Sequence, residues 1–319
     1  MRSRMIEPWV RAACPDGRGA STAAAPPVVP GTSCSVFPAD NVWNMDVSKF
    51  PVSANSAKWH DTMAASTTNL HPDFGPPKDC GIPYDVVTSA HPLIPVKFLY
   101  ADESDPGPYP FGRDIQVEGG SDRHAIMINR DTCRLYELYA ARLKGSKASA
   151  GGGAIFNLAS NAPATRHVDQ RRRRGPADLP GAAALRRGAG RRRQPRDPLH
   201  RLLHGPELRL AGDPPGGPDR EPELSVHGRS PAHEAGFDMS GYSPQARTIL
   251  TAMKRYGMIL ADNGSNFFFQ GAVDARWPAS LIAELKTVPG SSFQVIDESG
   301  CRAAAGSYRY VYGTSCPAP

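Results

Sequence analysis

The sequence predicts a mostly β fold of the β+α class, an antiparallel β-sandwich or a jelly-roll-like domain with one packed amphipathic helix. Three observations predict it. Many short apolar runs are separated by Pro and Gly, two neighbouring runs alternate with a period of two, and a single long segment has helical periodicity. With 319 residues the chain is long enough to bury a substantial core.

The N-terminal half contains the strongest strand signals. The runs IPYDVV (82–87) and LIPVKFLY (93–100) predict short strands with loops between them. HAIMINRDTCRLYELY (124–139) consists of two alternating runs that flank Arg130-Asp131, which predicts a hairpin. A two-residue turn would place His124 opposite Glu137, with Ile126, Ile128, Cys133 and Leu135 on the same face, whereas a three-residue turn would break this pairing.

The C-terminal half contains the clearest helix. SPQARTILTAMKRYG (243–257) begins with a Ser cap followed by Pro, places Ile249, Leu250, Met253 and Tyr256 on one face, and ends at Gly. MILADNGSNFFFQGAV (258–273) predicts a strand, an Asn-Gly turn and a second strand. A short helix over 278–288 and the strand FQVID (293–297) follow.

An arginine-rich window between Arg166 and His233 carries the excess charge. It holds 15 Arg and 8 acidic residues, so the other residues contribute 22 of the 37 basic and 23 of the 31 acidic side chains and are close to neutral. The window contains ten Pro and none of the 25 Phe, Tyr and Trp residues. Such a composition cannot bury enough apolar surface to offset its ordering entropy, so we expect disorder.

The window also has the composition of an out-of-frame translation. Arg is encoded mostly by CGN codons, and a shift of one base turns Arg runs into GNC codons for Ala, Asp, Gly or Val. Applied from Arg166, the shift converts the text into GTWTSADAAGLPTFPG and then LLRYDEVRAGVVNHAIRFTVYCTG, in which aromatic residues and strand alternation return. We interpret the window as frameshifted; an arginine-rich nucleic-acid arm and a natural disordered linker are the alternatives.

Several in-frame motifs carry a family resemblance. VFPADNVWNMDVSKFPV, DRHAIMINRDTCRLYELYAAR, GAIFNLASNA and AGFDMSGYSPQARTILTAMKRYGMILADNGSNFFFQGAVDARW resemble a family of uncharacterised, secreted bacterial proteins from high-GC organisms. The resemblance covers residues near 33–163 and 235–300, together with the recovered text between them, and it implies no activity. We divide the chain into a flexible leader (1–32), two parts of one β domain (33–163 and 235–300), the out-of-frame segment (164–234) and a tail (301–319).

Cysteine content favours an extracellular or cell-surface location. Six Cys residues suit disulfides in a secreted protein, their spacing matches no zinc motif, and Cys34 with Cys301 or Cys316 would tie the termini together. No apolar run is long enough for a membrane span. The N-terminus lacks the apolar core of a signal peptide as written, which suggests a misassigned start.

The cluster Asp122-Arg123-His124 with Glu137 is the leading catalytic candidate. A His and a carboxylate across a hairpin could share a proton and act as acid or base near neutral pH. The alternative is a buried His satisfied by a structural Glu. The recovered frame adds a second His, at the codon now read as Pro195, and two His with one Glu would resemble a 2-His-1-carboxylate site. In this chain that His is absent, and we assign no metal.

The remaining candidates are a strand-end carboxylate and aromatic side chains. Asp262 could form an acid/base pair with Glu137 in glycoside hydrolysis, although Asp-Asn-Gly is also ordinary turn chemistry. Trp43 and Trp277 could stack on sugar rings, with Asn263 as a polar contact, and core packing is the alternative. Neither the Gly-rich SAGGGAIFNL nor GYSPQ matches a phosphate loop or a serine-hydrolase motif.

The sequence therefore predicts a carbohydrate-active protein, either a glycoside hydrolase or a polysaccharide lyase, that uses His124 and Glu137 with Asp122 or Asp262. The alternatives are a non-catalytic glycan-binding or cell-surface structural protein and a metal-dependent enzyme. We expect a polysaccharide partner, no cofactor, no nucleic acid and no membrane span. The out-of-frame window is expected to impair this copy.

Overall fold

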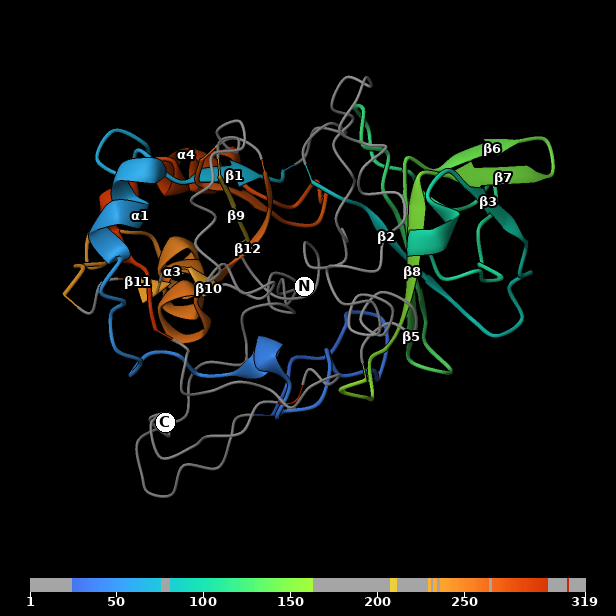
Figure 1. Ribbon diagram of the computed structural model, residues 1–319, viewed down its shortest axis with the longest axis horizontal. Helices are drawn as coiled ribbons and strands as arrows, with labels where there is room; N and C mark the ends of the chain where they lie inside the picture. The colour runs from blue at the N-terminus through green and yellow to red at the C-terminus, as the bar shows by residue number, and fades with distance from the viewer. Residues whose placement is uncertain are drawn as a thin grey trace, which may run out of the picture.

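The computed structural model describes residues 25–75, 81–162, 207–210, 229–230, 232–233, 236–263, 266–297 and 309. Figure 1 shows two lobes side by side. The strand lobe contains β2 (Tyr84–Val87), β3 (Val96–Phe98), β4 (Ala125–Asn129), β5 (Arg134–Tyr139), β6 (Arg142–Lys144), β7 (Lys147–Ala150) and β8 (Gly152–Asn157), with a 3₁₀ turn at Ala101–Glu103. The mostly β prediction is confirmed.

The helix lobe combines all the α-helices of the described residues with short strands. Its elements are α1 (Ser56–Thr62), β1 (His71–Asp73), β9 (Glu207–Leu210), β10 (Arg229–Ser230), β11 (Ala232–His233), α3 (Pro244–Tyr256), β12 (Met258–Asn263), β13 (Phe268–Gln270), α4 (Ala279–Leu285), a 3₁₀ turn (Gly290–Ser292) and β14 (Phe293–Gln294). None of the helices in the described part of the chain has the length and apolar character that a membrane span needs.

The sheets are mixed, which corrects the expectation of purely antiparallel pairing. The strand lobe contains a sheet with the order β2-β4-β5-β8 and a second with the order β3-β7-β6. The pairs β2–β4, β3–β7, β1–β13 and β9–β12 are parallel. The described strands form no closed barrel. The finer expectation, a sandwich or jelly roll, stays a prediction.

Hydrophobic clusters cover both faces of the β2-β4-β5-β8 sheet. One face packs against the β3-β7-β6 sheet through Ala125, Met127, Tyr136, Leu138, Val96, Ala148 and Ala150. The other face carries Ile126, Ile128, Leu135 and Phe156 and is covered by the N-terminal segment with Val36, Phe37 and Trp43. Every residue of β4 is buried as a result. This burial positions the start of β4, where His124 lies.

The β4–β5 hairpin has a four-residue loop instead of the predicted two-residue turn. Asn129 pairs with Arg134, and Ile126 pairs with Glu137. The Asn129 side chain explains the longer loop, because its Oδ1 accepts hydrogen bonds from the backbone N–H groups of Asp131 (3.0 Å) and Thr132 (3.1 Å). The predicted register, with His124 opposite Glu137, is therefore wrong by two residues.

A disulfide joins Cys34 to Cys133 at the end of this loop, with the Cα atoms 5.3 Å apart. The pairing of Cys34 with Cys301 or Cys316 is therefore wrong. Cys34 belongs to the N-terminal segment that covers the sheet face, and Cys133 ends the hairpin loop beneath it. The disulfide thus fixes the cover to the sheet across 99 residues of sequence.

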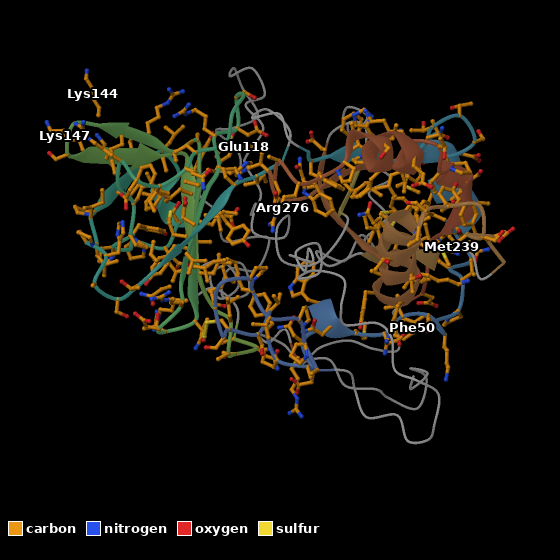
Figure 2. All side chains as sticks on the ribbon, turned by 180° about the vertical axis from the view of Figure 1, so that it is seen from behind. Phe50, Glu118, Lys144, Lys147, Met239 and Arg276 are labelled. Atoms are coloured by element: carbon orange, nitrogen blue, oxygen red, sulfur yellow. A yellow bond between two sulfur atoms is a disulfide. The ribbon has the colours of Figure 1, made fainter. Side chains whose placement is uncertain are left out.

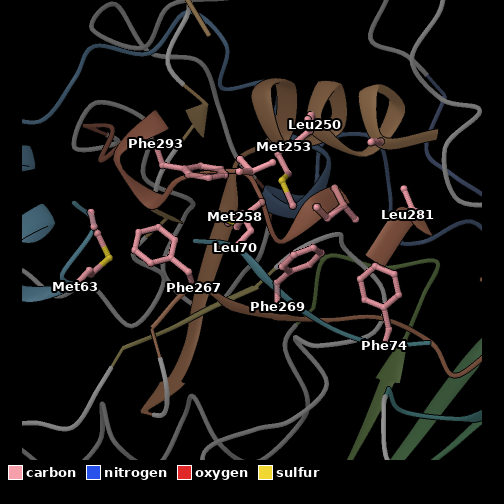
Figure 3. Packing of buried hydrophobic residues seen from close by; sticks show 14 of the residues in the cluster. Met63, Leu70, Phe74, Leu250, Met253, Met258, Phe267, Phe269, Leu281 and Phe293 are labelled. Carbon is pink, nitrogen blue, oxygen red and sulfur yellow. The ribbon is translucent and has the colours of Figure 1, made fainter. Parts of the chain in front are cut away.

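Helix α3 forms as predicted and organises the helix lobe. The Ser243 hydroxyl accepts a hydrogen bond from Ala246 N, Pro244 occupies the first turn, and Gly257 ends the helix at φ 70°. Leu250 and Met253 are fully buried against Met258, Phe267 and Phe293 (Figure 3). The short predicted helix over 278–288 corresponds to α4, which packs on α3.

The strands after α3 do not form the predicted hairpin. β12 pairs with β9 and β10, whereas β13 pairs with β1 in another sheet. Phe267 lies between them with a positive φ of 57° and a fully buried ring. Its carbonyl accepts a hydrogen bond from His71 N (2.8 Å), which directs β13 onto β1.

Three short strands, β9, β10 and β11, fall inside the arginine-rich window, so at these residues the structure differs from the expected disorder. The alternation in Glu207–Leu210 suits the β9 strand that pairs with β12. The rest of the window, including the codon read as Pro195, lies outside the described residues. The out-of-frame interpretation stays a prediction, as do the leader and the tail.

His71 on β1 makes the stability of the helix lobe depend on pH. Its imidazole stacks on Phe268 with centroids 3.8 Å apart. Burial lowers the pKa of His71 below 6.5, Lys286 adds to the effect, and Asp73 opposes it. The unfolded chain then binds more protons than the folded chain, so stability is fully present above about pH 6.5 and falls as the pH drops towards the folded pKa.

We therefore expect His71→Phe, which keeps an aromatic ring on Phe268, to show a smaller loss of unfolding free energy between pH 7.5 and pH 5 than the unmodified chain. Urea denaturation at the two pH values measures this difference. An unchanged pH dependence would exclude His71 as its source.

Candidate functional site

The candidate site lies at the start of β4, on the sheet face that the N-terminal segment covers in part. His124 directly precedes β4 and its side chain is 1% exposed. The Nδ1 of its imidazole is in close hydrogen-bond contact with Oε2 of Glu118. The same carboxylate oxygen accepts a hydrogen bond from the backbone N–H of His124 at 3.1 Å. Glu118, not Glu137, is therefore the partner of His124.

A Gly-Gly turn brings Glu118 to this position. The chain reverses at Gly119-Gly120, and Gly120 has a φ of 75°, a conformation that glycine adopts without a steric penalty. The backbone N–H of Glu118 then donates to the carbonyl of His124 at 2.8 Å. Our sequence reasoning missed Glu118. Its signal was a carboxylate six residues before the His with a Gly-Gly turn between them.

Two non-glycine residues in left-handed conformation flank His124. Arg123 has a φ of 50° and Ala140, on the facing strand end, has a φ of 51°. The Ala140 N–H donates to the Asp122 carbonyl (2.8 Å), and the Ala141 N–H donates to the Arg123 carbonyl (3.0 Å). The Arg123 Nε in turn donates to the Ala141 carbonyl (3.1 Å). Each such residue costs about 1–3 kcal/mol, and residues of this kind cluster at functional sites.

Three further side chains share the sheet face with His124. Tyr139 is half-buried, and its ring centroid lies 5.7 Å from that of His124. Glu137 is 1% exposed and lies opposite Ile126, two residues along β4 from His124. Tyr84 on β2 pairs with the same Ile126 from the other side. Among the described residues no hydrogen bond joins His124 to Glu137.

The loop after β13, in the helix lobe, approaches this face and carries an ion pair between Asp274 and Arg276. The Ile82 N–H donates to the Gly271 carbonyl (3.0 Å), which holds the loop after β13 against the start of β2. The hydrogen bond from Arg276 lowers the pKa of Asp274. Burial raises the pKa of Tyr84, and the charges of Arg276 and Asp274 act on it in opposite directions. Figure 2 shows Glu118 and Arg276 between the lobes.

The other predicted site residues lie apart from this group or inside the core. Asp262 and Asn263 belong to β12 in the helix lobe, where they pair with Arg209 and Leu210 of β9. Trp43 is 7% exposed and packs in the core over the sheet face. Trp277 is half-buried, and its ring centroid lies 4.9 Å from that of Phe74. Its indole N–H donates a hydrogen bond to the Ala272 carbonyl (3.0 Å). Asp122 lies beside the site, where its backbone carbonyl accepts the hydrogen bond from the Ala140 N–H.

The group of Glu118, His124, Glu137 and Tyr139 has the composition of an acid/base site. Glu118 orients the imidazole through Nδ1, which leaves Nε2 as the atom that can exchange a proton with a substrate. Among the described residues no three His, Cys, Asp or Glu side chains are grouped as metal ligands. Comparison with protein-family models, curated proteins and solved structures found no match to the chain.

Proposed function

We propose that the protein is a polysaccharide-processing enzyme, a secreted or cell-surface hydrolase or lyase, whose acid/base group is His124. The observation that carries this proposal is the His124–Glu118 pair between two residues in left-handed backbone conformation. A carboxylate that fixes an imidazole is the recurring unit of general acid–base catalysis. The expected sandwich or jelly-roll architecture belongs to the same proposal.

Each side chain has a distinct proposed role. His124 exchanges a proton with the glycosidic oxygen, or with the sugar ring carbon in an elimination, through Nε2. Glu118 holds the imidazole in one orientation through its hydrogen bond with Nδ1. Glu137 is the second carboxylate on the face, and Tyr139, half-buried like Glu118, is the aromatic group proposed to contact a bound sugar.

The burial of His124 and Glu137, each 1% exposed, favours a second candidate function, a non-catalytic glycan-binding or surface-structural protein. In that protein the His124–Glu118 pair would join the loop over 118–123 to the start of β4. The two candidates make different predictions for a variant of His124. If the protein is an enzyme, the variant forms less product; if the pair is structural, the variant is only less stable, because the protein forms no product.

The test is a screen of neutral and acidic polysaccharides for new reducing ends and for the ultraviolet absorbance of unsaturated products, which separates hydrolysis from elimination. The chain as printed and a version with the window restored to the other frame are screened together. We expect His124→Ala to lower kcat by about 10²–10⁴-fold. Glu118→Gln should lower it as well, and the control His91→Ala, which removes an imidazole paired with Asp114 in the loop between β2 and β3, should leave it within about twofold of the unmodified chain.

Two results would overturn the enzyme proposal. One is polysaccharide binding without product by both versions of the chain, and the other is equal activity of the unmodified chain and His124→Ala. The first result supports the non-catalytic candidate. Sequencing the gene around codons 160–236 decides which of the two versions is the natural one.

A further inference from the structure

The outer face of the β3-β7-β6 sheet carries a group of cations. Side chains alternate along each strand, so Val96, Ala148 and Leu143 face the core while their neighbours face outward. The outward residues Lys97, Arg142, Lys144 and Lys147 are all exposed. We call these four side chains the basic face. Figure 2 shows Lys144 and Lys147 at the free end of the β6–β7 hairpin, which projects from the strand lobe.

The register places the four cations close together. Ser149 of β7 pairs with Lys97 on one side and with Arg142 on the other, so the three lie in one row across the sheet. Lys144 and Lys147 lie directly opposite each other. Neighbouring strands are about 4.8 Å apart and successive outward residues about 6.7 Å apart, so all four charges fall within a small grid.

Nothing in the described part of the chain neutralises the basic face. Among the residues that the structure describes, no ion pair involves any of its four side chains, and the row between Lys97 and Arg142 is completed by the neutral Ser149. Like charges directly opposite each other destabilise a strand pair. The Lys144–Lys147 pair thus destabilises the β6–β7 hairpin by charge repulsion, and a bound polyanion would remove this repulsion.

We infer that the basic face binds an acidic polysaccharide, a glycan chain with carboxylate or sulfate groups. The face carries no aromatic side chain on which a nucleic-acid base could stack, and Phe98, the aromatic residue of β3, points to the core. Beside the basic face, Leu99 directly follows β3 and is a large apolar side chain that is 73% exposed. A flat sheet surface with spaced cations suits an extended chain with repeated negative charges.

The basic face is distinct from the His124 site. β6 and β7 lie in the second sheet, whereas His124 faces the opposite side of the β2-β4-β5-β8 sheet. The inference therefore goes beyond the proposed function: it concerns anchoring to an acidic glycan and does not require catalysis. His124→Ala should keep the binding, which separates failure of the proposed enzyme activity from failure of this inference.

The experiment measures the affinity of the full chain for polygalacturonate by calorimetry at about 50 mM and about 200 mM salt. The test variant is Lys144→Glu with Lys147→Glu. The control is Lys49→Glu with Lys286→Glu, two exposed lysines outside the basic face, which changes the net charge by the same amount. All three proteins carry the same arginine-rich window, so differences between them report the exposed lysines alone.

We expect the test variant to bind at least about tenfold more weakly at low salt, with a shallower dependence of log affinity on log salt, and the control to stay within about twofold. Equal losses in both variants, or none, would overturn the inference, and so would equal binding of neutral dextran. Binding to a single-stranded oligonucleotide or to phosphatidylserine vesicles without binding to polygalacturonate would also overturn it.

Discussion

Replacing Cys34 and Cys133 together by Ala is expected to lower the free energy of unfolding by about 4 kcal/mol. The disulfide closes a loop across 99 residues and fixes the N-terminal cover to the β4–β5 hairpin. Without it the unfolded chain gains the entropy of a long open loop. Cys34 is 1% exposed, so alanine avoids placing a hydroxyl in the core.

Urea denaturation under oxidising conditions measures this loss. The unmodified chain in reductant provides the matched control, because its stability should fall to that of the double variant. A loss below about 1 kcal/mol would show that the cover stays on the sheet without the covalent bond.

Phe267→Ala is expected to lower the unfolding free energy by about 3–5 kcal/mol, because the fully buried ring leaves a cavity among well-packed neighbours. The ring lies near that of Phe293 (Figure 3), with the two ring centroids 6.0 Å apart. It also closely contacts Gly290, where an added Cβ atom would come within 2.7 Å of the ring. The helix lobe packs around this contact.

The control for Phe267→Ala is Leu93→Ala, since Leu93 is 50% exposed and its removal should change the stability by less than about 0.5 kcal/mol. Comparable effects of the two substitutions would contradict the placement of Phe267 in the core.

Local signals predicted those elements whose stability is local. Helix α3 has its cap at Ser243, its terminating Gly257 and its apolar stripe within a single segment, so periodicity and capping rules were sufficient. The strands β2 and β3 also lie inside the predicted runs over 82–87 and 93–100. These elements owe their limits to Pro, Gly and side-chain alternation.

Pairing between strands depends on interactions that the sequence pattern does not display. The loop after β4 is two residues longer than predicted because the Asn129 side chain bonds two backbone N–H groups, and that shift moves Glu137 away from His124. β13 joins β1 in parallel because Phe267 turns into the core and bonds His71. Both outcomes follow from tertiary contacts.

The candidate site was partly predictable. His124 and Glu137 lie on the same sheet face, as alternation predicts, although the partner of His124 is Glu118. Asp262, by contrast, lies on β12 in the helix lobe, because β12 pairs with β9 and β10 and does not extend the strand lobe. The position of a strand in the sequence does not determine which lobe it joins.

Glu118 is the partner of His124, and a double-mutant cycle in unfolding free energy measures the strength of this pair. The cycle compares His124→Ala, Glu118→Gln and the double variant with the unmodified chain. A matched control cycle compares His124→Ala, Glu137→Gln and their double variant. We expect a coupling of about 1.5–3 kcal/mol between His124 and Glu118 and a much smaller one between His124 and Glu137. A larger coupling to Glu137 would show that Glu118 is not the partner of His124.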